Sequence, residues 1–315
     1  MQVAIIISSV LGLPALHALA AQGAVAGVAM PRLPASDETE QLAQAAAGLG
    51  LPVTYLPRQG LGAALRAWLT PLAPAAVLVF TFPWRIPAAV LEVPTHGFLN
   101  FHFAALPGYR GPEPLFWQIR NGETAGAVTV HRMAADFDTG PVLLAAPVPI
   151  GPADTHGLHS AQLAGQAAPV ALRLLASLRG EAPALTPEPQ DAAQARYWPR
   201  ATLADVCIRW DEPSAAIERL VRAANPWNRG ALATLRGQEL RVLASTVRPE
   251  TLVAPPGTVV LAAPGQALLV ACGEGQVLQL DMICLDEGYF TGGQLAGMGL
   301  QPGEKLGTLL IRQPV

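Results

Sequence analysis

The stretch NFHFAALPGYRGPEPLFWQIRNGETAGAVTVHRMAADFDTG, residues 100–140, decides the fold because it holds two strand-like runs with polar side chains at their ends. An apolar run ends in Asn100 and His102, and a second run, Ala127–Met133, leads into a loop that carries Asp138. Open α/β proteins place their ligands and chemistry at strand ends beside glycine-bent loops. The stretch therefore predicts a functional site at one edge of a sheet.

The side chains available in this stretch suit acyl transfer without a covalent enzyme intermediate. A neutral histidine serves as general acid or base near pH 7, and an asparagine donates hydrogen bonds to an oxyanion without titrating. A carboxylate near the histidine orients it, raises its pKa or relays a proton. The stretch holds no Cys, no Lys and no Ser in a nucleophile-elbow pattern, which disfavours a Ser or Cys mechanism.

Strand-like and helix-like runs alternate along the residues that precede this stretch. Apolar, β-branched runs predict strands at Val3–Ile7, Val25–Ala29, Val53–Leu56 and Ala76–Phe80. Helices are predicted between them at 14–21, 37–47 and 62–69. Strands that alternate with helices predict an α/β fold with a doubly wound, mostly parallel sheet. No G-x-G-x-x-G or P-loop follows the first strand, so the usual nucleotide-binding fingerprints are absent.

The residues after the stretch predict a second, smaller domain. A further strand at Val142–Ile150 and a helix capped by Asp154 or Thr155 complete a catalytic domain at 1–182. Residues 183–203, rich in Pro, Ala and Glu, are predicted to be a linker. Between 204 and 315, short strands punctuated by Gly and Pro predict an OB-like β-barrel domain. These strands are Leu240–Ala244, Thr258–Ala262, Ala267–Ala271 and Val277–Ile283.

Composition limits the classes of function. The 315-residue chain has 14% charged residues and a net charge of −3, with no basic excess for general polyanion binding. Its three cysteines lack C-x-x-C spacing, which favours a reduced, cytoplasmic chain over a zinc site. The first 30 residues carry no charge, but no basic residue precedes Arg32, and Pro14 and His17 interrupt the apolar run. We therefore expect a buried strand and helix there, not a signal peptide or a membrane span.

The motifs of this stretch resemble the signature of the 10-formyltetrahydrofolate-dependent formyltransferases in both order and spacing. The matching pieces are Asn100/His102, Leu106–Gly111, Trp117, Asn121–Glu123, Gly126–His131 and Asp138–Pro141. In this family an acceptor amine attacks the formyl carbon, Asn and His stabilise the oxyanion, and Asp helps to move protons. The resemblance implies that Asn100, His102 and Asp138 are the catalytic residues. One departure is Ala104, where the family often has Ser.

The resemblance also implies a folate pocket. By position, residues 81–87 correspond to the family loop that helps to form this pocket. Phe82 and Trp84 are expected to cover the flat pteridine, although an aromatic loop packed on the core is the alternative. The implied formyl donor is 10-formyltetrahydrofolate. The predicted cofactor-binding residues are Phe82, Trp84, Arg85, Ile86 and Asp136.

Other ionisable residues of the stretch have less specific roles. His96 and His131, with His102 and Asp138, are residue types that bind zinc, but the family uses no metal and we expect none. His96 and His131 are expected to be structural histidines. For Arg110 two roles are open, binding an anionic group or bracing its loop by a salt bridge.

The acceptor amine is less well determined than the chemistry. Segments at 197–200, 208–210, 225–231 and 300–307 resemble the C-terminal domain of many family members, and the best-known acceptor of such enzymes is initiator methionyl-tRNA. Binding tRNA calls for Lys and Arg contacts to phosphate. Residues 30–39 carry one Arg and two carboxylates, however, and the chain from Asp205 onward has nine basic and eleven acidic residues. This charge balance lowers the expectation for tRNA without excluding it.

Three alternatives therefore accompany the methionyl-tRNA hypothesis. Other family members formylate a nucleotide-linked amino sugar or a carrier-bound amino acid, and 116–117 and 197–202 are at least as similar to those relatives. A formyltetrahydrofolate hydrolase would keep Asn100, His102 and Asp138 and use water in place of the amine. A folate-binding protein without catalysis is disfavoured because all three residues are present. The sequence assigns no oligomeric state.

Overall fold

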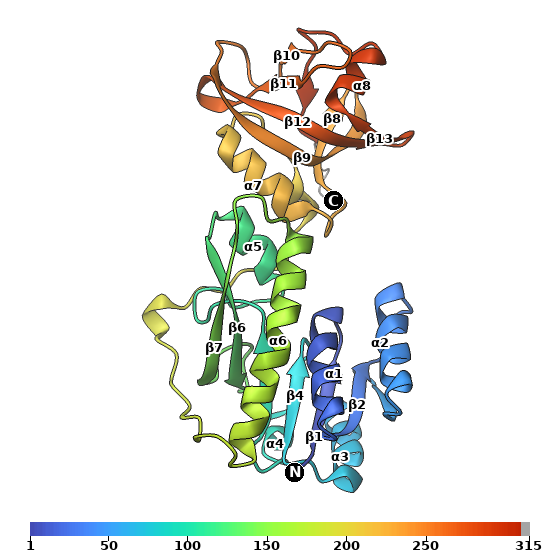
Figure 1. The fold of residues 1–315 in the computed structure, drawn as a ribbon, viewed down its shortest axis with the longest axis vertical. Helices are drawn as coiled ribbons and strands as arrows, with labels where there is room; N and C mark the ends of the chain where they lie inside the picture. The colour runs from blue at the N-terminus through green and yellow to red at the C-terminus, as the bar shows by residue number, and fades with distance from the viewer. Residues whose placement is uncertain (310–315) are drawn as a thin grey trace. The chain divides into compact units, whose positions relative to one another are not determined.

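The computed structural model describes residues 1–309, which form two compact units (Figure 1). The first unit comprises Met1–Pro114, Ala125–Pro149 and Ser160–Pro199. The second comprises Leu115–Thr124, Ile150–His159 and the chain from Arg200 onward. Two segments from the middle of the sequence thus belong to the C-terminal unit. The division into a catalytic domain at 1–182 and a second domain at 204–315 stays a prediction. None of the helices within 1–309 combines the length and the apolar character needed to cross a membrane.

The first unit is built on a seven-stranded sheet of order β3-β2-β1-β4-β5-β6-β7. The strands are β1 Val3–Ile7, β2 Val25–Pro31, β3 Val53–Leu56, β4 Ala76–Phe80, β5 Phe98–His102, β6 Ala125–Arg132 and β7 Val142–Pro149. The strands from β1 to β5 pair in parallel, and β6 and β7 pair antiparallel to their neighbours. Every residue of β1 and β4 is buried, as their continuous apolar runs require. The prediction of a doubly wound, mostly parallel sheet is confirmed.

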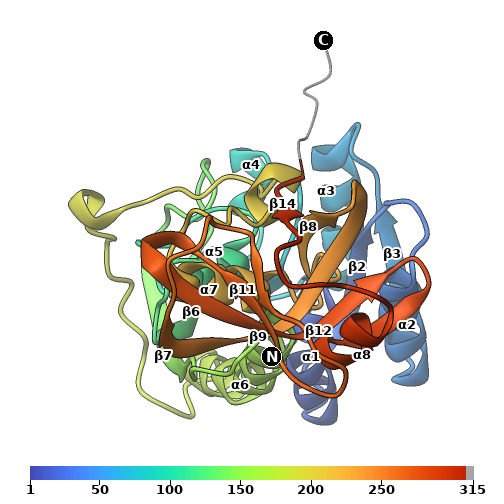
Figure 2. The same ribbon diagram turned by 90° about the horizontal axis from the view of Figure 1, so that it is seen from above.

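Helices cover both faces of this sheet. They are α1 Leu13–Ala21, α2 Asp37–Gly48, α3 Leu61–Leu72, α4 Ala88–Leu91 and most of α6, which spans His156–Leu178. Figure 2 shows α3 and α4 on one side of the strands and α1, α2 and α6 on the other. On the first side Ala4 and Ile6 of β1 pack in one core cluster with Leu65 and Leu69 of α3. Burial of these apolar helix faces against the sheet contributes more to the stability of the helices than their intrinsic helix propensity does.

Local hydrogen bonds and backbone conformation set where α2 begins and where β4 ends. A capping box begins α2, where the Ser36 hydroxyl accepts the Thr39 backbone N–H and the Thr39 hydroxyl accepts the Ser36 N–H. At the carboxyl end of β4, Thr81 has a φ of 59°, a conformation that costs energy for a β-branched residue. The Ser8 hydroxyl donates to the Thr81 carbonyl at 3.0 Å. The loop after β4 is thereby tied to the end of the neighbouring strand β1.

The second unit is a closed antiparallel barrel. Its strand order is β10-β11-β12-β9-β8-β14, with β13 paired to β12. The strands are β8 Ala231–Leu235, β9 Gln238–Thr251, β10 Val259–Leu261, β11 Leu268–Ala271, β12 Gln276–Leu285, β13 Gly288–Thr291 and β14 Leu306–Gly307. The two ends of the sheet meet, because Val259 donates its N–H to the Glu304 carbonyl at 2.9 Å and Leu306 to the Gly257 carbonyl at 2.8 Å. The predicted OB-like barrel is confirmed.

Within residues 200–309, two α-helices that the sequence pattern did not predict complete the second unit. They are α7 Ser214–Ala224 and α8 Gly292–Gly297. The core of this unit also contains α5, Pro114–Arg120, which comes from the middle of the chain. Phe116 of α5 is fully buried, and its ring centroid lies 5.1 Å from that of Trp227. Part of the signature stretch therefore serves the core of the C-terminal unit.

Candidate active site

Two neighbouring strands bring the predicted catalytic residues together. Asn100 and His102 lie two residues apart on β5, so their side chains project from the same face of the sheet. On β6, His131 is the direct cross-strand partner of Asn100. The Asn100 Nδ2 atom lies 3.0 Å from His131 Nε2. The antiparallel register of β5 and β6 thus places a second histidine in the site.

The hydrogen bonds of His131 fix the orientation of the Asn100 amide. His131 Nδ1 lies 3.1 Å from the Arg132 carbonyl, which can only accept, so Nδ1 carries the hydrogen. Nε2 of the neutral ring then accepts a hydrogen from Asn100 Nδ2. The second hydrogen of that amide stays available to another acceptor. His131 is 2% exposed and, beyond the structural role predicted for it, contacts two of the predicted catalytic residues.

Asp138 approaches both histidines from the loop after β6. Its Oδ1 atom lies 3.6 Å from His102 Nδ1 and 3.7 Å from His131 Nε2, and its side chain is 12% exposed. The Gly111 N–H donates to Oδ2 at 2.9 Å. Burial alone would raise the pKa of the Asp138 carboxyl, but the facing His102 and the hydrogen bonds outweigh burial and lower it to about 2. Asp138 is therefore an anion throughout the neutral range.

His102 is hydrogen-bonded at one ring nitrogen and faces a carboxylate at the other. Its Nε2–H donates to the Tyr109 carbonyl at 2.6 Å, and its Nδ1 faces Asp138. Burial lowers the pKa of His102, and the Asp138 carboxylate and the Tyr109 carbonyl offset only part of this effect. The ring is consequently neutral near pH 7 with an unprotonated Nδ1. A proton that arrives at Nδ1 is stabilised by the adjacent carboxylate, which is the property of a general base.

The lowered pKa of Asp138 predicts loss of stability in acid. Because Asp138 binds protons more weakly in the folded chain than in the unfolded chain, its contribution is complete above about pH 5 and is progressively lost as the pH falls toward 2. The shift from 3.8 to about 2 corresponds to about 2 kcal/mol of the free energy of unfolding. Urea unfolding between pH 6 and 3 measures it. The stability difference between the wild type and Asp138→Asn should narrow as the pH falls, and a constant difference would contradict this assignment.

The predicted folate residues lie on two loops that meet each other. The Arg85 guanidinium pairs with the Asp136 carboxylate at 3.2 Å, and both side chains are about two-thirds exposed. Arg85 also lies over the Phe137 ring, 5.5 Å from its centroid. Phe82 and Trp84 pack edge to face, 5.4 Å between centroids, and are half-buried against the core. These two aromatic side chains thus expose an apolar surface while the core holds them in place, which suits a planar ligand.

Other predicted residues fall away from this cluster. The Ile86 side chain is 4% exposed and belongs to the core, so only its backbone remains for contact with a ligand. His96 precedes β5, at the opposite end of that strand from His102. Within residues 1–309, no three His, Cys, Asp or Glu side chains gather in an arrangement that could hold a metal ion.

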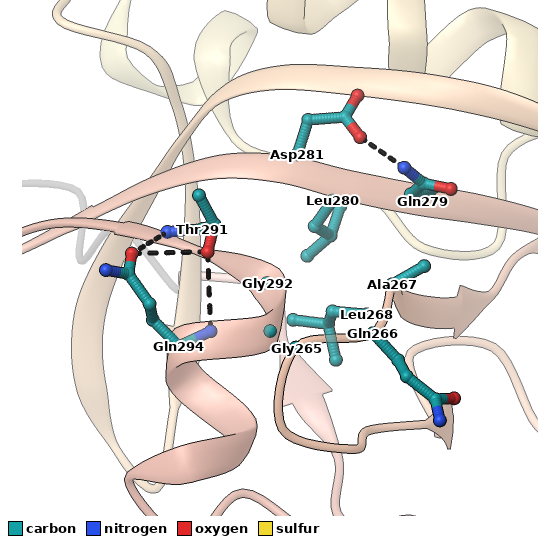
Figure 3. A pocket seen from close by; sticks show the side chains of 11 residues that line it. Gly265, Gln266, Ala267, Leu268, Gln279, Leu280, Asp281, Thr291, Gly292 and Gln294 are labelled. Carbon is teal, nitrogen blue, oxygen red and sulfur yellow. Dashed lines mark hydrogen bonds between the residues drawn. The ribbon is translucent and has the colours of Figure 1, made fainter.

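A pocket of about 350 Å³ in the second unit holds none of the predicted site residues (Figure 3). Several of its polar groups bond to one another. Asp281 accepts from the Gln279 amide at 2.6 Å, and the Gln294 side-chain carbonyl accepts the Thr291 N–H at 2.7 Å. The lining therefore presents partnered groups, whereas the cluster around His102 presents a buried base beside a carboxylate.

Comparison with known proteins places the chain among formyl transferases. The chain matches the formyl transferase family over residues 25–173 and the formyl transferase C-terminal domain over residues 200–288. The methionyl-tRNA formyltransferase of Deinococcus radiodurans is 35% identical over 281 residues, which cover 88% of this chain and 86% of that protein. The corresponding protein of Pseudomonas fluorescens is 38% identical over 223 residues, covering 71% of this chain and 68% of that protein.

Solved structures share the fold at lower identity. An N-formyltransferase from Helicobacter canadensis, in complex with folinic acid and dTDP-3-aminofucose, has a TM-score of 0.69 and 16% identity, covering 89% of this chain and 98% of that chain. HypX from Aquifex aeolicus, in complex with tetrahydrofolic acid, has a TM-score of 0.60 and 17% identity, covering 99% of this chain and 51% of that chain. These structures share the fold, and the sequence matches over most of the length lead to one conclusion: the chain belongs to the formyl transferase family.

Proposed function

We propose that the chain transfers the formyl group of 10-formyltetrahydrofolate to the amino group of methionyl-tRNA. The observation that carries this proposal is the largely buried cluster of Asn100, His102 and Asp138, in a chain that matches methionyl-tRNA formyltransferases over most of their length. The cluster supplies a hydrogen-bond donor, a base and a carboxylate. In this proposal residues 1–182 perform the transfer and residues 204–315 help to hold the acceptor.

Each residue of the cluster has a separate part in the proposed reaction. The acceptor nitrogen attacks the formyl carbon, the bond from that carbon to N10 of the folate breaks, and one proton passes from the amine to N10. Asn100 donates its second amide hydrogen to the oxyanion of the tetrahedral intermediate. His102 Nδ1 takes the amine proton, and Asp138 stabilises the resulting imidazolium. Phe82 and Trp84 pack against the pteridine, with Arg85, Asp136 and the Ile86 backbone beside them.

A small amine is the second candidate acceptor, because carboxylates neutralise most of the arginines of the second unit that the structure describes. At least five of the eight arginines in 200–309 pair with nearby carboxylates. The pairs are Arg209–Asp211, Arg222–Glu218, Arg236–Glu304, Arg241–Glu239 and Arg248–Glu250. An arginine held by a carboxylate contributes less to a phosphate-binding surface than a free one. This pattern favours an acceptor with few phosphates, such as a nucleotide-linked amino sugar.

An assay of formyl transfer with matched acceptors tests the proposal. The formyl donor is incubated with the protein and charged initiator tRNA, with a nucleotide-linked amino sugar, or with no acceptor. We expect formyl-methionyl-tRNA, and we expect KM for the tRNA to rise between 50 and 200 mM salt because phosphate contacts release counterions. If only the sugar is formylated, the acceptor is the amino sugar and not the tRNA. Donor turnover without any acceptor would mean a hydrolase.

A further inference from the structure

The segment at 188–198 lies against the loops that hold His102 and Asp138. Glu188 and Val142 exchange backbone hydrogen bonds of 2.8 Å in both directions, which fixes the register of the segment beside β7. Further along, Arg110 donates its N–H to the Arg196 carbonyl at 3.0 Å and accepts the Trp198 N–H at 2.8 Å. The composition of this segment predicts a linker, but backbone hydrogen bonds hold it in place as they would hold a strand. We call residues 188–198 the strap.

The amide of Gln190 joins both loops at once. Its Nε2 donates to the carbonyls of Asp138 and Gly140, each at 2.7 Å. Its Oε1 accepts from Nε and Nη2 of Arg110 at 3.1 and 2.8 Å. The orientation of the amide is unambiguous, because carbonyls only accept and a guanidinium only donates. Arg110 therefore braces its loop through an amide, not through the salt bridge considered from the sequence.

The loop that carries Asp138 needs such support. Asp138 has a φ of 58°, and a residue other than glycine in the left-handed region is strained by about 1 kcal/mol or more. Gly140 passes so close to β6 that an added Cβ would lie 1.8 Å from the Arg132 carbonyl oxygen. The two hydrogen bonds from Gln190 bracket Thr139 and hold the backbone on either side of it.

The other loop is held by the same segment. An added Cβ at Gly111 would lie 2.0 Å from the Trp198 carbonyl oxygen, so the strap and the loop pack backbone to backbone. The Tyr109 and Trp198 rings stack with 5.6 Å between centroids and 11° between planes. The carbonyl of Tyr109 accepts from His102, and the N–H of Gly111 donates to Asp138. The positions of these two loops therefore set the separation of His102 and Asp138.

We propose that Gln190 is a positioning residue of the active site, which locks the loop at 104–111 to the loop at 134–141 and so sets the distance between His102 and Asp138. The effect on activity rests on the proposed function, whereas the geometric effect does not. Displacement of a reacting group by about 1 Å costs about 100-fold in rate. Gln190 thus acts on the reaction through the two loops without touching the substrate.

The test compares Gln190→Ala with Gln190→Glu. The alanine variant removes all four hydrogen bonds, whereas the glutamate variant keeps an acceptor for Arg110 and removes only the donors to Asp138 and Gly140. The control is Gln194→Ala, an exposed amide of the same segment that bonds Asp191 at 2.9 Å. For both Gln190 variants we expect kcat to fall by about 10- to 100-fold with the donor KM nearly unchanged. We expect the control to match the wild type.

A measurement without turnover separates positioning from general support. The pKa of the His102 ring is followed by NMR, with the His102→Ala variant for assignment. In Gln190→Ala we expect a lower pKa than in the wild type, because a more distant Asp138 carboxylate no longer raises it. An unshifted pKa, or a normal kcat in folded Gln190→Glu, would overturn the proposal. If the wild type transfers no formyl group but the pKa still shifts, the proposed function fails and the positioning role stands.

Discussion

Replacing His102 by alanine is expected to lower kcat/KM for formyl transfer by about 1,000- to 10,000-fold, which is the upper part of the range for loss of a general acid or base. In our proposal His102 Nδ1 is the atom that removes the proton from the attacking amine. No other side chain near Asp138 is equivalent, because His131 Nε2 is occupied by the Asn100 amide. Single-turnover transfer from 10-formyltetrahydrofolate gives the rate of the chemical step directly.

A folded but inactive variant is the informative result. His102→Ala removes the tie to the Tyr109 carbonyl, so circular dichroism and thermal unfolding must accompany the assay. The matched control is His17→Ala, which removes an exposed histidine from α1. We expect His17→Ala to transfer at the rate of the wild type. Turnover within about tenfold of normal in folded His102→Ala would remove His102 from the proposed catalytic role.

Asp138→Asn is expected to produce the second largest loss, about 100- to 1,000-fold in kcat. Asparagine tolerates the left-handed backbone at 138 as well as aspartate does, and its side-chain oxygen can still accept the Gly111 N–H. The substitution removes the negative charge 3.6 Å from His102 Nδ1. His102 then has no counter-ion when it takes a proton, so the imidazolium is less stable and the base is weaker.

The comparison for this variant is a surface charge change of the same kind. Asp286→Asn alters an exposed carboxyl in the second unit and should leave kcat unchanged. Folate binding to Asp138→Asn, measured by fluorescence titration, should stay within about threefold of the wild type if the charge acts mainly on the transition state. A loss confined to donor affinity would assign Asp138 to binding and would remove it from proton transfer.

The fold of the first unit could be predicted because its signals are local. Continuous apolar runs such as Val3–Ile7 and Ala76–Phe80 are buried on both faces of a parallel sheet, and each became a strand with the predicted bounds. The helices of the second unit were harder to predict from the sequence. The helix α7 buries Ile217, Leu220 and Val221 at helical spacing, but it is short and lies between irregular segments. The helix α5 comes from the middle of the chain and packs in the core of the second unit. No local pattern predicts this packing, because it depends on tertiary contacts.

The candidate site was predictable only in part, for a similar reason. The motif spacing indicated Asn100, His102 and Asp138, and the structure brings the three together. Gln190 lies 52 residues from Asp138 in a segment whose Pro and Ala content is typical of a linker, so no local pattern marks it. His131 was visible in the motif, but its contacts arise from strand pairing. Hydrogen bonds over such separations follow from topology, which residue spacing alone does not specify.

The pairing of β5 with β6 also restricts how this family member can change during evolution. Asn100 faces His131 and His102 faces Thr129 across the two strands. Because side chains alternate between the faces of a sheet, a single-residue insertion or deletion inside β6 would turn His131 to the opposite face. Such a chain would retain every functional side chain in its sequence and still lose the site. The number of residues in β6 between these pairs therefore matters to the site as much as the identity of the residues themselves.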